Sequence, residues 1–142
     1  MDTFKFSEPH ISYGATDDSN ALELIKMIRK GIGYTAFEKF VLAFPYSLAE
    51  WSGFLHLSER SMQRYKKEKR AFDPIQSEKI VEIAMLFKLG EEVFGSRAKF
   101  NVWLQTESLP LNKVKPVALI DNSFGIGLVK DELMRIEQGI LA

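Results

Sequence analysis

The chain has 142 residues, of which 46% are hydrophobic and 27% are charged, and this balance is typical of one globular domain or of two small ones that share a core. Its 19 Lys and Arg residues equal its 19 Asp and Glu residues, so the formal net charge is zero. That balance excludes a uniformly basic nucleic-acid binder, but it leaves room for a locally basic face. The absence of cysteine excludes disulfides, cysteine-ligated zinc, thiolate catalysis and iron–sulfur clusters.

The sequence predicts neither a targeting signal nor a membrane span. The first residues lack the basic start and the apolar run of a signal peptide. The longest apolar runs, such as residues 40–44, are far shorter than the ~20 residues that span a bilayer. We therefore expect a cytoplasmic protein.

The chain opens with a segment, residues 1–19, that shows no sustained period and is expected to form an N-terminal tail. From residue 20 the period becomes helical. The spacing predicts a helix that buries Leu22, Ile25 and Ile28 and stops at Gly31.

The next two helices carry start signals of their own. Thr35 is a candidate cap for a second helix, which Pro45 ends. An apolar stripe at i, i+3, i+4 and i+7 runs along it and consists of Phe37, Phe40, Val41 and Phe44. Ser47 with Glu50 three residues later forms a capping box for a third helix, and Ser58 is placed to cap a fourth.

The rest of the chain is also predicted to be helical. Pro74 opens a fifth helix, and a break is expected after it near Gly90 and Gly95. A short helix around residues 99–105, an irregular stretch and a last helix that ends at Gly139 follow. With about seven helices and no strand-like alternation, the expected fold class is all-α: a helix-turn-helix bundle followed by a small helical domain.

Residues 47–70 have the pattern of a helix-turn-helix, in which two short helices are separated by residues 54–58. The second helix, residues 59–70, carries six Lys and Arg residues against two Glu residues, a net of +4 in a neutral chain. Met62 and Tyr65 mark its buried side. The opposite side carries four residues, named here the recognition face: Arg60, Gln63, Arg64 and Lys67.

The recognition face has the chemistry of a DNA contact. Arg and Gln side chains hydrogen-bond base edges in the major groove, and Lys neutralises phosphates. A basic surface helix is often merely solvated, and both interpretations stay open for this helix. The net charge of zero predicts modest DNA affinity, which dimerisation would increase.

Catalysis finds no support in the sequence. The two histidines are His10, in the expected tail, and His56, in the turn, where a bond to a backbone carbonyl is the expected role. Without cysteine or paired histidines no metal site is expected. Phosphate-binding and nucleophile motifs are also absent, so we expect a protein that is not an enzyme and needs no cofactor.

Four short motifs occur after the basic helix in a specific order and spacing: Phe94-Gly95, Trp103-Leu104, Pro116 and Ile136-Glu137-Gln138-Gly139. Because of these motifs, residues 35–139 resemble the Xre/MbcA/ParS antitoxin family. The second half of the chain resembles the C-terminal toxin-binding domain of that family. The resemblance implies that residues 20–72 form an Xre-like helix-turn-helix domain and that residues 73–142 form the toxin-binding domain. The fifth helix is expected to bridge both.

The family resemblance also implies partners. The usual partner is a RES-domain toxin that consumes NAD, and the antitoxin blocks access to the toxin's active site. The helix-turn-helix half typically forms a homodimer, within a larger hetero-oligomer, and represses its own operon by binding operator DNA. The rival interpretation is a stand-alone Xre-type transcriptional regulator whose C-terminal half only dimerises.

Six residues are expected to contact the toxin: Trp103, Leu109, Leu111, Val114, Phe124 and Gly125. The loop of residues 109–115 is the expected exposed contact, where an inserted charge at Leu111 or Val114 should leave the fold intact. For Trp103 and Phe124 an ordinary core position is the simpler interpretation, and for Gly125 it is a helix-opening turn.

Overall fold

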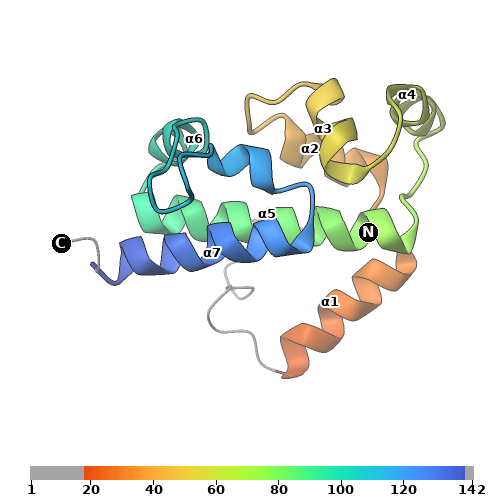
Figure 1. The fold of residues 1–142 in the computed structure, drawn as a ribbon. Helices are drawn as coiled ribbons and strands as arrows, with labels where there is room; N and C mark the ends of the chain where they lie inside the picture. Colours follow the sequence, from red (N-terminus) through yellow and green to blue (C-terminus); the bar gives the residue numbers. More distant parts are fainter. Residues whose placement is uncertain (1–17, 140–142) are drawn as a thin grey trace.

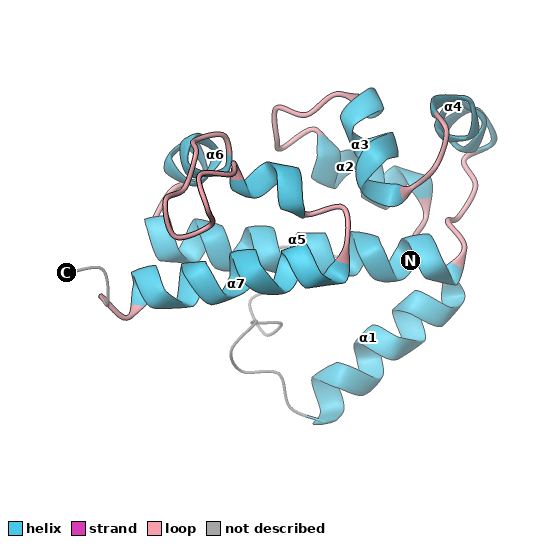
Figure 2. Cartoon of the chain, in the orientation of Figure 1, coloured by secondary structure: helices cyan, strands magenta, loops and turns pink. Residues whose placement is uncertain are grey.

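In the computed structural model, residues 18–139 are described, and they form helices joined by loops with no strand (Figures 1 and 2). The elements are α1 (Asp18–Lys30), α2 (Tyr34–Val41), α3 (Leu48–Leu55), α4 (Glu59–Glu68), α5 (Pro74–Phe94), α6 (Arg97–Leu104), the 3-10 helix η1 (Pro116–Leu119) and α7 (Ser123–Glu137). The all-α prediction is confirmed. The expected tail, with His10, lies outside the described residues except for its last two positions, which begin α1.

The longest helix, α5, runs through the middle of the molecule (Figure 1). Helix α7 lies alongside it, α1 packs on it from below, α6 covers one end and the α2–α4 group covers the other. Because neighbours surround it, α5 buries side chains on most of its circumference. Its buried apolar residues are Ile80, Val81, Ile83, Ala84, Leu86, Phe87 and Leu89.

Of the two glycines predicted to break the fifth helix, Gly95 is confirmed and Gly90 is wrong. The helix continues to Phe94 and ends at Gly95, whose φ of 76° is the left-handed conformation common after a helix. Gly90 has a packing role instead, since a Cβ there would lie 2.1 Å from the Phe100 ring. Glycine therefore lets α6 cross α5 closely.

Helix α1 buries only part of the predicted face. Leu22 and Ile25 are 59% and 40% exposed, whereas Ile28 packs against the core as predicted. Leu24 is buried and Met27 also packs against the core. The apolar residues of this helix are crowded enough to fit two overlapping stripes, and packing against α5 selects the one through Leu24. The expected Thr35 cap is also wrong, because Gly33 occupies the N-cap of α2.

The other start signals are confirmed. Ser47 and Glu50 form both hydrogen bonds of a capping box at α3. The Ser58 hydroxyl accepts a hydrogen bond from the Ser61 backbone N–H at 3.0 Å and so caps α4. Asp73 occupies the N-cap of α5 with Pro74 next to it, although its side chain makes no capping bond.

An aromatic cluster holds the α2–α4 group on α5. Trp51 is fully buried and meets Phe37, Phe40 and Phe54 edge-on, with ring centroids 5.1–5.5 Å apart. Such arrangements stabilise a core by about 0.5–1.5 kcal/mol per pair beyond the burial itself. The Phe87 ring of α5 lies 5.8 Å from the Phe40 ring, so the cluster fixes α2 and α3 on α5.

None of the described helices is both long enough and apolar enough to cross a membrane.

Candidate functional site

Helices α3 and α4 form the predicted helix-turn-helix. His56 ends α3 in the left-handed conformation, with φ 57°, and Ser58 caps α4 two residues later. Met62 and Tyr65 are buried at 0% and 4% exposure, as expected. All four residues of the recognition face are exposed, and their i, i+3, i+4 and i+7 spacing places them on one side of α4.

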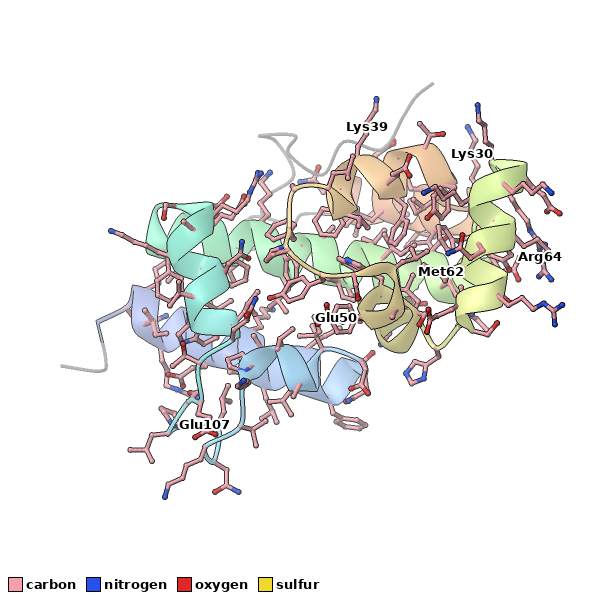
Figure 3. All side chains as sticks on the ribbon, turned by 90° about the horizontal axis from the view of Figure 1, so that it is seen from above. Lys30, Lys39, Glu50, Met62, Arg64 and Glu107 are labelled. Atoms are coloured by element: carbon pink, nitrogen blue, oxygen red, sulfur yellow. The ribbon has the colours of Figure 1, made fainter. Side chains whose placement is uncertain are left out.

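The charges on the recognition face are free to meet a partner. Lys66 pairs with Glu38 at 3.8 Å on the inner flank of α4. By contrast, Arg60, Arg64 and Lys67 have no carboxylate partner within residues 18–139. Figure 3 shows Arg64 pointing outward at one end of the molecule, away from buried Met62. This surface has the charge and the hydrogen-bonding groups of a major-groove contact.

The start of α7 carries an exposed aromatic ring. Phe124 is 89% exposed, so it is not a core residue. Leu128, one turn later, is 53% exposed and lies on the same side of the helix. Two adjacent apolar side chains in water are typical of a protein-binding surface. Sequence reasoning missed Leu128, although its i+4 spacing from Phe124 was the available signal.

The loop of residues 106–115 supplies a second exposed apolar residue. Leu109 is 75% exposed, and Figure 3 shows the loop, with Glu107 labelled, projecting beyond the helices. The Ser108 N–H donates to the Val114 carbonyl at 3.1 Å and closes the loop. Asn112 and Lys113 at its tip both have a positive φ, of 63° and 65°, which is costly for non-glycine residues.

Three of the expected contact residues lie wholly or partly inside the molecule. Leu111 is only 8% exposed, so the expectation of an exposed side chain there is wrong: the tight loop turns Leu111 inward while Leu109 points out. Trp103 is half-buried, with its ring 5.6 Å from that of Phe94 and 6.2 Å from that of Phe100. Val114 is also half-buried.

Gly125 is buried and allows the start of α7 to pack closely on η1. A Cβ there would lie 1.7 Å from the Leu119 carbonyl oxygen, so only glycine lets α7 begin against η1. Its N–H donates to the Asn122 side chain at 2.8 Å, which caps α7. Gly125 therefore lies in the helix-opening turn expected there, and its close packing on η1 fixes where Phe124 leaves the backbone.

His56 has the expected kind of partner, a backbone carbonyl, but one far away in sequence. Its Nε2 lies 2.6 Å from the carbonyl oxygen of Asp121, next to the N-cap of α7. This contact joins the helix-turn-helix to the start of α7. Over residues 18–139, no group of three or more His, Asp or Glu side chains is placed to hold a metal ion.

Two family models match the chain. The model of the antitoxin Xre-like helix-turn-helix domain matches residues 23–85, and that of the antitoxin Xre/MbcA/ParS C-terminal toxin-binding domain matches residues 89–139. The first contains the recognition face, and the second contains both the projecting loop and Phe124. No curated protein matches the chain over its sequence.

Proposed function

Since the chain belongs to the Xre/MbcA/ParS-type antitoxins, we propose that it neutralises a RES-domain toxin acting on NAD, in the cytoplasm, by covering the toxin's active-site cleft. The family gives the antitoxin role with a helix-turn-helix and a toxin-binding domain. The identity of the toxin, its action on NAD and the occlusion mechanism are our proposal. No step of chemistry is assigned to the chain itself.

The exposed ring of Phe124 is the observation that best supports the proposed toxin-binding surface. Burying a side chain of this size against a partner stabilises a complex by about 1.5–3 kcal/mol. Gly125 and the capped start of α7 fix the backbone that carries the ring before binding, which lowers the entropic cost of association. We assign the primary contact to Phe124 with Leu128, and a second contact to Leu109.

The remaining expected residues fit a supporting role. Leu111 is buried and Val114 half-buried within the loop that presents Leu109, and Trp103 packs on Phe94 and Phe100. In this proposal they position the toxin contact, and residues 73–142 act as the toxin-binding part. Residues 20–72 act as the DNA-binding part, with α5 common to both.

Operator binding with autorepression is the second proposed activity. The observation that supports it is the recognition face, with three cations that have no carboxylate partner among the described residues. A single α4 in a neutral chain predicts modest affinity, so we propose that a homodimer, held within the toxin complex, presents two recognition helices to the operator.

The deciding experiment is made in cells. The neighbouring open reading frame is induced with and without this chain, while growth and cellular NAD are followed. We expect the neighbour alone to arrest growth and deplete NAD, and co-expression to restore both. A harmless neighbour with steady NAD would overturn the proposed toxin.

A stand-alone transcriptional regulator is the competing function. Such a protein should bind its operator tightly without any partner, and its C-terminal half should only dimerise. Measuring operator affinity with and without the neighbouring protein separates the two. An affinity that is already high and does not respond to the neighbour would favour the regulator.

A further inference from the structure

The end of α1 lies directly beside the chain that leaves the recognition helix. Residues Gly33 and Ala71 form an isolated antiparallel bridge. The Phe72 N–H donates to the Ile32 carbonyl at 2.8 Å, and the Tyr34 N–H donates to the Arg70 carbonyl at 3.2 Å. Segments that are about 40 residues apart in sequence are thus joined backbone to backbone.

A buried serine and a glycine hold this junction together. The Ser77 hydroxyl accepts from the Ile32 N–H at 2.8 Å and donates to the Phe72 carbonyl at 3.2 Å, and the side chain is fully buried. Gly31 has a φ of 96°, and a Cβ there would lie 2.5 Å from the Phe72 carbonyl oxygen. Only glycine allows so close an approach, so α1 ends at a defined place beside residues 70–72, which follow α4.

The junction concentrates positive charge. Residues 29–30 and 66–70 together contain six Lys and Arg residues and one Glu. Lys66 and Arg70 are each paired with a carboxylate, Glu38 and Asp73. Four cations have no carboxylate partner in the part of the chain that the structure describes: Arg29, Lys30, Lys67 and Lys69.

Arg29 and Lys30 are exposed and lie at the end of α1, next to the bridge that joins residue 33 to residue 71. In the view of Figure 3, Lys30 and Arg64 project from the same end of the molecule, whereas Figure 1 draws α1 below α5 and α4 above it. No residue of the first predicted DNA contact set comes from α1. The acidic groups near these cations are Glu68 and the two ion-pair partners Glu38 and Asp73, so the junction keeps an excess of positive charge.

We propose that Arg29 and Lys30 form a second DNA contact, which binds backbone phosphates of the duplex beyond the C-terminal end of the recognition helix. The inference rests on the proposed DNA-binding activity and deepens it. Long basic side chains outside the base-contacting face bind phosphates, which position a protein without reading sequence. The rigid junction at Ser77 keeps the spacing between this contact and α4 constant, as a composite interface requires.

The test is the salt dependence of DNA binding by the full chain. Affinity for the promoter duplex and for a random duplex of equal length is measured by fluorescence anisotropy over a range of salt concentrations. For the variant Arg29→Gln/Lys30→Gln we expect the slope of log K against log salt to fall by about 1.8, because each phosphate contact contributes about 0.9. The preference for the promoter duplex over the random one should stay unchanged.

Two controls separate local contacts from net charge and from misfolding. The variant Lys99→Gln/Lys113→Gln removes the same charge from exposed positions on α6 and the projecting loop, and it should leave the slope near that of wild type. The swap Arg29→Lys/Lys30→Arg keeps both charges and should keep the slope. Thermal unfolding followed by circular dichroism checks the fold of each variant.

Three results would overturn the inference. The first is a salt slope for Arg29→Gln/Lys30→Gln equal to that of wild type. The second is an equal fall in salt slope for the control Lys99→Gln/Lys113→Gln, and the third is that Arg29→Gln/Lys30→Gln loses toxin binding and keeps DNA binding. In the last case the patch is a protein contact. If wild type binds no duplex, alone or with its toxin, the DNA-binding proposal itself fails, and that outcome is distinguishable from the other three.

Discussion

The Nε2 atom of His56 lies 2.6 Å from the carbonyl oxygen of Asp121, and this contact joins the turn of the helix-turn-helix to the start of α7. Because a carbonyl oxygen only accepts, the bond requires a proton on Nε2. The residue has two tasks, since it also adopts the left-handed conformation that ends α3. The orientation of α4 and the emergence of Phe124 from α7 are thereby linked.

Replacing His56 with alanine should lower the free energy of unfolding by about 1–2 kcal/mol, because both the hydrogen bond and a residue tolerant of positive φ are lost. Asparagine adopts this conformation readily but is too short to reach Asp121 in the same way, so His56→Asn should fall between alanine and wild type. Urea denaturation measures all three. Equal stabilities would show that the contact contributes nothing.

Phe124→Asp should weaken toxin inhibition by at least about tenfold, the loss of a central aromatic anchor. The fold should be unaffected, because the ring is 89% exposed. Leu42→Asp is the matched control, since Leu42 is 80% exposed at the end of α2, in the other matched segment. Titration of toxin activity with each variant gives the comparison, and equal inhibition by both would remove Phe124 from the interface.

The two leucines of the projecting loop should respond oppositely to a charge. Leu109→Asp should weaken toxin binding with normal stability, because the side chain is 75% exposed. Leu111→Asp should destabilise the protein by about 2–5 kcal/mol, as expected for the loss of a buried leucine. Thermal unfolding separates the two before any binding is measured. A stable Leu111→Asp variant would contradict the inward position of that side chain.

Arg64→Ala should weaken promoter binding by about 1–3 kcal/mol and reduce discrimination against a random duplex, if Arg64 contacts a base. Arg64→Lys keeps the charge but not the forked hydrogen bonds, so it should recover affinity for both duplexes more than it recovers discrimination. Competition binding gives both quantities. An unchanged promoter affinity for Arg64→Ala would show that the recognition face is assigned to the wrong side of the protein.

Gly90→Ala should destabilise the protein by about 1–3 kcal/mol through overpacking against Phe100. The sign is informative, because the same change inside an open helix stabilises by about 1 kcal/mol. Phe100→Leu should relieve the clash, so the double variant Gly90→Ala/Phe100→Leu should lose less than the two single effects added together. Guanidinium denaturation of wild type, the two single variants and the double variant gives the free energies of unfolding for this double-mutant cycle.

Features determined by near neighbours in the chain were predictable. Ser47 and Ser58 cap α3 and α4 through bonds to residues three positions away, and the buried side of α4 follows from a simple period. The family motifs predicted the class of protein. Those signals give the type of each element, but not which neighbour it packs against.

Features that depend on packing between distant segments were not predictable. Gly90 resembles a helix breaker until Phe100 is seen to occupy the space of its missing side chain. The buried face of α1 was ambiguous because its apolar residues fit more than one stripe. For Phe124, composition favoured a core position, and only the tight start of α7 at Gly125 shows why the ring faces outward.

The two matched segments meet inside α5, between residues 85 and 89, and this has a consequence for how such proteins can diversify. Ile83 and Phe87 lie on a helix that packs on both the α2–α4 group and on α6 and α7. An exchange of halves between two relatives would divide that shared helix and leave mismatched cores on either side. New toxin or operator specificity is therefore expected to arise by point changes on the exposed surfaces, rather than by recombination of domains.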